Sequence, residues 1–289
     1  MFGLKQYEQV NSLINRRLAE VGVLVVSHRG AGVGSAAQNT ALGVRGALAS
    51  GAEMVEIDVA ASSDGTFYCF HDGTEPEALG IDDNIQYLSA EEIDKLRYIR
   101  VDRPGRPSPV ERLLPLLKEF QGTDALFNLD RSWWRWPAFL KALESLGMIE
   151  QITLKCPAWD LSAVGLLSKY PVKYPFVPIC SSMDDVDRVI GMPGLNTIGV
   201  ELLTEIPIHP WLQRETIDTL HERGVFTLAS TVTLPTGVPL FGGYDDEKAV
   251  LGDPADVFAP LMDLGIDAIQ TDWPWLLKSV RDSRATLAE

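Results

Sequence analysis

The sequence has 289 residues, 46% of them hydrophobic, which is enough for the core of one large α/β barrel or of two smaller domains. Its 25 basic and 40 acidic residues give a formal net charge of −15, which argues against nucleic acid or an anionic membrane surface as the main partner. No apolar run approaches the roughly 18 residues that a spanning helix needs, so we expect no stable membrane insertion.

The N-terminus and the cysteines indicate a cytoplasmic protein. Charged residues such as Lys5, Glu8 and Arg16 stand where a signal peptide would be apolar. The cysteines are odd in number, and each lies in a mostly apolar, strand-like stretch. We predict that all three are buried reduced thiols: Cys69, Cys156 and Cys180.

Helical and strand patterns alternate from the N-terminus onward. An amphipathic pattern over residues 2–20 predicts a helix that covers the N-terminal end of a barrel or meets a partner subunit. Short apolar runs predict strands, and apolar residues at helical spacing predict the helices between them. The predicted strands cover residues 23–27, 54–59, 67–70, 125–129, 151–154, 175–179, 197–202, 225–229 and 267–270, and the later helices cover 41–48, 110–120, 136–146, 161–168, 184–190, 213–223, 255–264 and 275–281.

The alternation predicts eight strand–helix units in one α/β domain over residues 1–289, a TIM (β/α)8 barrel. A doubly wound open sheet is the alternative. An N-terminal helix would occupy residues 1–21. Two connections are long: an insertion over 60–122 after strand 2, which starts with a β-hairpin, and a loop over 230–253 after strand 7. Both leave C-terminal strand ends, where barrel enzymes keep their sites, so we expect the second to be an active-site loop.

Charged side chains follow the first strands at the points where these strands end. The first apolar run stops at His28 and Arg29, just before a Gly-rich turn, and the next strand carries Glu56 and Asp58. Because these two acids are two residues apart on a strand, their side chains point to the same face. An Asp-Gly hairpin turn then returns the chain to His71. These side chains are therefore candidate site residues.

Six fragments, in chain order, resemble those of the glycerophosphodiester phosphodiesterase family, a group of phospholipase C-like TIM-barrel phosphodiesterases. The resemblance spans nearly the whole chain and is strongest over residues 25–72. The fragments are HRG (28–30), QNT (38–40), GAEMVEIDV (51–59), DGTFYCFHD (64–72), NLD (128–130) and GIDAIQTDWP (265–274).

The resemblance implies a set of site residues. His28 and His71 would be the acid–base pair, Arg29 would bind the phosphate, and Asn39 would line the site. The residues that would hold a divalent metal ion are Glu56, Asp58 and Asp130.

Electrostatics supports the metal site. Carboxylates about 4 Å apart repel one another by about 4 kcal/mol per pair at an effective dielectric constant of about 20. A hard divalent cation removes this repulsion, and oxygen ligands point to Mg²⁺ or Ca²⁺. A second interpretation of Asp130 is a helix N-cap, since a helix must begin nearby.

Imidazole and guanidinium chemistry also fits a phosphodiester. Two histidines with a pKa near about 6.5 can act as one neutral base and one charged acid, and Arg29 offers a bidentate fork to phosphoryl oxygens. In the resembled family the base takes a proton from a hydroxyl next to the ester, which gives a cyclic phosphate that water then opens. Other interpretations stay open: His28 caps a loop, Glu56 faces outward, and Lys155 is either a second phosphate contact or a surface lysine.

The chain departs from the family pattern at several positions. Gln38 replaces the acid before Asn-Thr, the shorter Asp130 replaces Glu, and Ser132 replaces a Lys for which Lys155 is a candidate substitute. The stretch 74–84 lacks an Arg that is often found after His-Asp, and FTLAST lacks a Trp. These departures leave the phosphodiester chemistry intact but loosen the tie to glycerol as the substrate alcohol.

The sequence therefore predicts a metal-dependent hydrolase that cleaves a small polar glycerophosphodiester to an alcohol and a phosphomonoester. A sugar–phosphate–sugar diester of the agrocinopine type is a variant, motivated by the loop 230–253 and the aromatic cluster at 133–136, which otherwise serves packing. A sphingomyelinase D-like activity on lysophospholipids would need an exposed apolar lip. The alternative class is a non-catalytic barrel that binds a phosphate ligand. The expected partner is a small molecule, and a homo-oligomer is compatible with these features.

Overall fold

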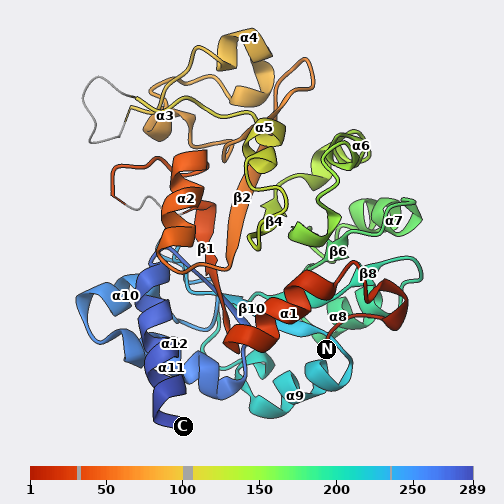
Figure 1. Ribbon diagram of the computed structural model, residues 1–289, viewed down its shortest axis with the longest axis vertical. Helices are drawn as coiled ribbons and strands as arrows, with labels where there is room; N and C mark the ends of the chain where they lie inside the picture. Colours follow the sequence, from red (N-terminus) through yellow and green to blue (C-terminus); the bar gives the residue numbers. More distant parts are fainter. Residues whose placement is uncertain (31–33, 100–106, 235, 289) are drawn as a thin grey trace.

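The strands of the computed structural model form a ring of parallel neighbours surrounded by helices (Figure 1). The structure describes residues 1–30, 34–99, 107–234 and 236–288, so the Gly-rich turn at 31–33 and parts of the two long connections lie outside the described residues. In ring order the strands are β1 (Leu24–Ser27), β2 (Met54–Ala61), β4 (Leu126–Asp130), β5 (Ile152–Leu154), β6 with β7 (Pro175–Phe176 and Ile179–Cys180), β8 with β9 (Asn196–Thr197 and Gly199–Leu202), β10 (Phe226–Ser230) and β11 (Ala268–Thr271).

The ring closes, which confirms the predicted TIM-barrel fold. Two strand positions are interrupted, and the halves of each keep the same neighbours: β6 pairs with β5 and β8, while β7 pairs with β9. β9 pairs with β10, β10 pairs with β11, and β11 pairs with β1. An open sheet would leave two unpaired edges, so the doubly wound alternative is wrong.

Side chains that point into the ring change from apolar to polar along the strands. Side chains alternate between the two faces of a strand, so every second side chain points into the ring. On β2 these are Met54, Glu56 and Asp58, and on β4 they include Leu126 and Asn128. The polar end is the C-terminal end, where the site is built. The apolar layer below it contains Leu24, Val26, Met54, Leu126, Val177, Ile198, Phe226, Leu228 and Ala268.

The N-terminal helix covers the apolar end of the ring. In α1 (Ser12–Val21), Leu13, Ile14 and Leu18 are buried and pack on the apolar layer. The predicted helix over 2–20 is thus shorter than expected, with only a 3-10 turn, η1 (Lys5–Tyr7), before it. Asn15 explains the difference, since its side chain accepts a hydrogen bond from Phe2 N at 2.7 Å and folds the first residues back over the helix.

Helices follow the barrel strands close to their predicted positions. They are α2 (Ala41–Ala49), α5 (Leu113–Lys118), α6 (Ala138–Glu144), α7 (Leu161–Lys169), α8 (Met183–Ile190), α9 (Arg214–Glu222), α11 (Pro254–Leu264) and α12 (Pro274–Ala288). None of the helices in the described ranges is both long and apolar enough to cross a membrane. The three cysteines are buried and form no disulfide with one another, as predicted.

The connection after β2 begins with the predicted hairpin. β3 (Phe67–Cys69) pairs antiparallel with β2, and Gly65 in the turn has a φ of 87°, which glycine adopts without strain. The chain continues through α3 (Glu75–Ala78), η3 (Ile85–Tyr87) and α4 (Ala90–Ile93), which Figure 1 shows projecting from the barrel at the top of the view. This segment has its own small apolar cluster, so it holds its shape above the C-terminal strand ends.

The connection after β10 contains a helix that the sequence patterns missed. α10 (Asp246–Leu251) is capped by Asp245, whose side chain accepts a hydrogen bond from Glu247 N. Backbone hydrogen bonds tie the loop to the strand-end segment after β9, with Thr204 N donating to Leu240 O at 3.0 Å and Gly242 N donating to Thr204 O at 2.7 Å. The helix is too short for periodicity to reveal it.

Candidate active site

Three carboxylates meet at the C-terminal ends of two adjacent strands. β2 and β4 are paired so that Glu56 lies beside Asn128 and Asp58 beside Asp130. One oxygen from each of Glu56, Asp58 and Asp130 lies within 4.8 Å of the others. Glu56 and Asp58 are buried, which is consistent with the predicted inward direction and excludes an outward-facing Glu56.

Glu56 is short of hydrogen-bond partners. Its Oε2 accepts from Arg29 N at 2.9 Å, whereas its buried Oε1 has no partner among the described residues. Burial, reinforced by the charge of Asp58, raises the pKa of Glu56. An orphaned carboxylate oxygen inside an acidic trio fits a hard cation with oxygen ligands, because such a cation would satisfy the oxygen and offset the repulsion.

Asp58 is held by two neighbours from the loop after β1. Asn39 Nδ2 donates to Asp58 Oδ2 at 3.0 Å, and Asn39 Oδ1 accepts from Asp58 N at 3.1 Å. The Arg29 guanidinium Nε lies 2.9 Å from Asp58 Oδ2. Although burial alone would raise the pKa of Asp58, Arg29 and the other polar neighbours lower it, so this carboxyl stays ionised.

Arg29 and Asn39 both have left-handed backbone conformations, with φ of 52° and 56°. Non-glycine residues seldom adopt this region, and such strain concentrates at functional sites. A hydrogen bond from Asn39 N to Arg29 O at 2.7 Å locks the two turns together. The strained turns direct both side chains toward Asp58.

The buried ammonium group of Lys155 contacts both Asp130 and Glu201, which come from different sides of the barrel. Lys155 Nζ, at the end of β5, lies 2.9 Å from Asp130 Oδ2 and 3.0 Å from Glu201 Oε2 on β9. Lys155 is buried, so the surface-lysine interpretation is wrong, and the two acids outweigh burial and raise its pKa. The N-cap interpretation of Asp130 is also wrong, because the next helix, η4 (Trp133–Arg135), is preceded by Ser132.

His28 is bonded to a carboxylate. Its Nδ1 lies 2.9 Å from Asp272 Oδ1, just after β11. Burial alone would lower the pKa of His28, but the hydrogen bond and charge of Asp272 raise it. Buried Asp246, in α10, accepts hydrogen bonds from Asp272 N at 2.7 Å and from Thr271 Oγ1 at 2.6 Å, which orients the Asp272 segment.

His71 is bonded to a carbonyl. Its Nδ1 lies 3.0 Å from Asp72 O, and burial lowers its pKa. The Asp72 side chain is clamped by Arg131, whose Nη2 and Nε lie 2.7 and 2.8 Å from Oδ1, and by Gln86 Nε2 at 2.6 Å from Oδ2. Nδ1 donates to the carbonyl in the neutral tautomer, which leaves a lone pair on Nε2.

The site thus offers one histidine that favours the charged form and one that favours the neutral form. His28 follows β1 and His71 follows β3, and Arg29, the direct neighbour of His28, contacts Asp58 of the acidic trio. A charged imidazole can donate a proton to a leaving group, and a neutral imidazole can accept one from an attacking hydroxyl. This arrangement can perform acid–base chemistry on a substrate held by a guanidinium and a cation.

Five charged residues of this network were not assigned as site residues from the sequence. Two sequence signals could have identified some of them. Glu201 is an acid inside the apolar strand GVEL of β9, and Asp272 lies two residues after Gln270, on the face of β11 that points into the barrel. The remaining members lie on loops, where no periodicity identifies partners. The five are Asp72, Arg131, Glu201, Asp246 and Asp272.

Part of the chain matches a known protein family. Residues 28–135, which include both histidines and the acidic trio, match the Glycerophosphoryl diester phosphodiesterase family. This match confirms the resemblance predicted from the sequence and relates this region to phosphoric diester hydrolases. No curated protein matches the chain.

Solved structures with low sequence identity share the fold. A glycerophosphodiester phosphodiesterase from Agrobacterium tumefaciens has a TM-score of 0.64 at 20% identity, with 89% of this chain and 100% of that chain covered. For a glycerophosphoryl diester phosphodiesterase from Parabacteroides distasonis, the TM-score is 0.69 at 19% identity, with 91% and 87% covered. An Oleispira antarctica phosphodiesterase, in complex with the product sn-glycerol-3-phosphate, has a TM-score of 0.61 at 17% identity, with 90% and 96% covered.

Proposed function

We propose that this chain is a metal-dependent phosphodiesterase that cleaves a small glycerophosphodiester-type substrate to an alcohol and a phosphomonoester. The observation that carries the proposal is the pair of histidines with opposite Nδ1 partners beside an acidic trio. The family match over residues 28–135 supports it. The Oleispira neighbour was solved with a phosphomonoester product, which is the kind of product proposed here.

The acidic trio would hold the metal ion, Mg²⁺ or Ca²⁺, through Glu56, Asp58 and Asp130. A divalent cation in such a site withdraws charge from phosphoryl oxygens and so favours attack at phosphorus. Arg29, positioned by Asp58 and by its strained turn, would bind a phosphate oxygen with its terminal nitrogens. Asn39 would act through Asp58, which it holds at two points.

The histidines would move the protons. His71, neutral, takes a proton from a substrate hydroxyl next to the ester, and that oxygen bonds to phosphorus. His28, charged, gives its proton to the departing alcohol as its bond to phosphorus breaks. Such a neighbouring hydroxyl can have an effective molarity of about 10⁵ M or more, so no protein nucleophile is needed. With the roles reversed, water then opens the cyclic phosphate to the monoester.

The test is release of alcohol from a panel of diesters, with Mg²⁺ or Ca²⁺ present and with EDTA. We expect metal-dependent turnover, and we expect His28→Ala and His71→Ala each to lower kcat by about 10²–10⁴-fold, the usual contribution of an acid–base group. His221→Ala is the control, since His221 pairs with Asp267 at the opposite end of the barrel. Near-normal turnover in His71→Ala would disprove the two-histidine mechanism.

A second candidate function is a barrel that binds a phosphate ligand without turnover. The ion pair between Lys155 Nζ and Asp130 Oδ2 favours it, because this ammonium group can compete with a cation for the third carboxylate. Saturable binding of a diester, with no metal-dependent alcohol release from any member of the panel, would support this function over the first.

A further inference from the structure

A third strained residue lies beside the candidate site. In the described part of the chain, three residues other than glycine have positive φ angles: Arg29, Asn39 and Arg131, the last at 57°. The first two hold Asp58. Such strain persists where surrounding contacts maintain it, and it concentrates at functional sites. Arg131 directly follows Asp130 at the end of β4, so its left-handed backbone sets the direction of its side chain.

The Arg131 guanidinium contacts one carboxylate oxygen with two nitrogens. Its Nη2 and Nε lie 2.7 and 2.8 Å from Asp72 Oδ1, and the two side chains are only 22% and 11% exposed. Charge-assisted contacts are stronger than neutral hydrogen bonds, and burial reduces their screening by salt. The guanidinium also lies 4.8 Å from the ring centroid of Trp134, which stacks on the partly buried Trp133. An acid and an aromatic ring thus fix the position of Arg131.

This ion pair joins the turn that carries His71 to the barrel. Gln86 and Glu75 hold the turn, residues 71–75, by hydrogen bonds that stay within the insertion after β2. Within the described residues, Arg131 makes the turn's only side-chain hydrogen bond or ion pair with an element outside this insertion. Since β4 also carries the third carboxylate of the acidic trio, the ion pair fixes the turn relative to the trio.

The same ion pair determines what the imidazole of His71 meets. Its Nδ1 lies 3.0 Å from the backbone carbonyl of Asp72, the residue whose side chain Arg131 holds. A carbonyl oxygen accepts but cannot donate, so this contact keeps the proton on Nδ1 and the lone pair on Nε2. Burial lowers the pKa of His71, and the charges of Arg29 and Arg131 act in the same direction, against the charge of Asp58.

We infer that Arg131 is a positioning residue for His71 and acts on it through Asp72. The inference rests on the proposed function, in which His71 Nε2 takes the proton of the attacking hydroxyl as that oxygen bonds to phosphorus. Arg131 itself neither gives nor takes a proton. A general base must lie within about 2.6–3.2 Å of the group whose proton it removes, so displacement of the turn lowers the rate rather than the affinity. Two of the three guanidinium nitrogens face Asp72, which leaves only Nη1 for a direct substrate contact.

The kinetic experiment measures choline release from glycerophosphocholine at saturating metal. Arg131→Met should lower kcat by about 10- to 100-fold with little change in KM, because a displacement on the order of 1 Å has an effect of this size. Arg131→Lys keeps the charge but loses the two-nitrogen contact, so it should recover only a small part of kcat. The double variant Arg131→Met, Asp72→Asn should be no slower than the slower single variant, since the two residues act as one unit.

A spectroscopic experiment tests the same point without turnover. At about pH 8, above the usual imidazole pKa of about 6.5, ¹⁵N NMR of labelled histidine should show the Nδ1–H tautomer of His71, with His71→Ala providing the assignment. Arg131→Met should show a mixture of both tautomers. Arg45→Met is the matched control and should keep the wild-type signals and kcat. Arg45 also pairs with a carboxylate, that of Glu119 at 2.7 Å, and lies 5.2 Å from an aromatic ring centroid, that of Phe120.

The outcomes separate this inference from the function on which it rests. Wild-type kcat in Arg131→Met, full recovery in Arg131→Lys, or a lower kcat with the tautomer unchanged would overturn the inference and leave the two-histidine mechanism standing. A raised KM with kcat unchanged would also overturn it and assign Arg131 to substrate binding. No turnover of any diester by the wild-type protein would overturn the proposed function, whereas the tautomer measurement would still decide whether Arg131 controls His71.

Discussion

Asp272 gives His28 an environment that His71 does not have. A carboxylate 2.9 Å from Nδ1 stabilises the imidazolium, whereas the carbonyl of Asp72 fixes a neutral tautomer of His71. The two side chains are chemically identical, so their different protonation follows from these partners and from burial. The partner that sets the protonation of His28 thus lies 244 positions away in the chain, whereas the partner of His71 is the next residue.

The Asp272→Asn variant tests this assignment. The general acid must be protonated, so activity falls as the pH rises through the pKa of His28. Asp272 raises that pKa, and its neutral substitute should move the alkaline limb of the kcat profile to lower pH. The measurement is kcat between about pH 5 and 9, with Asp256→Asn on the exposed face of α11 as the control. An unshifted alkaline limb would show that His28 is not the acid.

Glu56 links the metal site to stability. Burial and Asp58 raise the pKa of Glu56 in the folded protein. Without metal, the contribution of Glu56 to the free energy of unfolding is therefore complete below the pKa of glutamate in the unfolded chain, about 4.3, and is lost as the pH rises through the pKa in the folded protein. A one-unit shift is worth about 1.4 kcal/mol, or roughly 2–4 °C in Tm for a protein of this size. In EDTA we therefore expect the Tm to fall as the pH rises above about 5, and Glu56→Gln to lose part of this fall.

Added metal provides the second measurement on Glu56→Gln. Mg²⁺ or Ca²⁺ should raise the Tm of the wild-type protein at neutral pH, and the variant should show a smaller rise, because one ligand oxygen has lost its charge. Glu119→Gln, in an exposed pair with Arg45, is the control for a lost surface carboxylate. Equal metal-induced Tm shifts in all three proteins would place the cation elsewhere.

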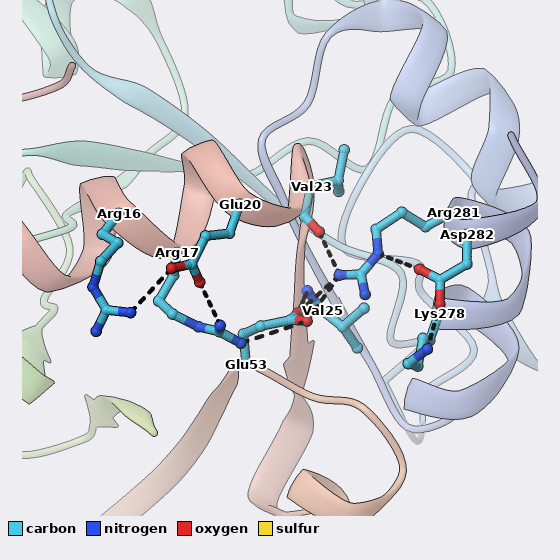
Figure 2. A network of polar contacts seen from close by, with 9 residues as sticks. All are labelled: Arg16, Arg17, Glu20, Val23, Val25, Glu53, Lys278, Arg281 and Asp282. Atoms are coloured by element: carbon cyan, nitrogen blue, oxygen red, sulfur yellow. Dashed lines mark hydrogen bonds and ion pairs between the residues drawn. The ribbon is translucent and has the colours of Figure 1, made fainter. Parts of the chain in front are cut away.

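The last helix is anchored to the first strands by a buried ion pair. Figure 2 shows Arg281 of α12 reaching Val23 O, at 2.8 Å, and Glu53, at 2.9 Å, while Glu53 also accepts from Val25 N at 2.9 Å. Arg17 of α1 approaches the same carboxylate at 3.9 Å. The ends of the chain are therefore held together beneath the barrel by one carboxylate.

Arg281→Ala tests this anchor. The variant leaves the buried carboxylate of Glu53 without its main partner, which typically costs about 3–5 kcal/mol of unfolding free energy. Arg284→Ala, which removes an exposed contact with Asp263 on the same helix, should have a much smaller effect. Urea denaturation of the three proteins measures both changes. A similar loss in the two variants would mean that Arg281 contributes only as a surface charge.

The whole molecule carries a field that opposes its proposed substrate. A net charge of −15 repels a phosphodiester of charge −1, and the local attraction of Arg29 must act against this field. Salt screens the distant charges more than the nearby ones, because the Debye length is about 10 Å at 0.1 M. Arg29 thus attracts an anionic substrate locally, whereas the net charge of the whole molecule repels it.

Varying the ionic strength separates the long-range repulsion by the net charge from the local attraction by Arg29. Between about 20 and 200 mM salt, we expect kcat/KM for anionic glycerophosphoglycerol to rise about two- to threefold at saturating metal. The zwitterionic glycerophosphocholine should change little and serves as the control. A fall in kcat/KM for the anionic substrate would show that the surface around the site attracts anions despite the overall charge.

The sequence determined the features that depend on neighbours in the chain. The alternation of strands and helices, the shared face of Glu56 and Asp58, and the hairpin before His71 all follow from local periodicity and turn chemistry. The family resemblance, strongest over residues 25–72, could also be found from the sequence, since its motifs are short and continuous, and the family match over residues 28–135 confirms it. The start of α1 was mispredicted, because Asn15 turns the first residues back by a contact that amphipathicity does not encode.

Only the tertiary structure decided which distant residues meet. His28 and Asp272 are 244 positions apart, and Lys155 finds Glu201 across the barrel because closure of the ring brings β5 and β9 around one interior. The exposed Trp134, Trp159 and Trp275 likewise lie at one end only because parallel strands deliver three separate connections, after β4, β5 and β11, to that end. No local pattern identifies the distant partner of a loop residue, so the carboxylate beside His28, and with it the protonation state of that histidine, is set by packing.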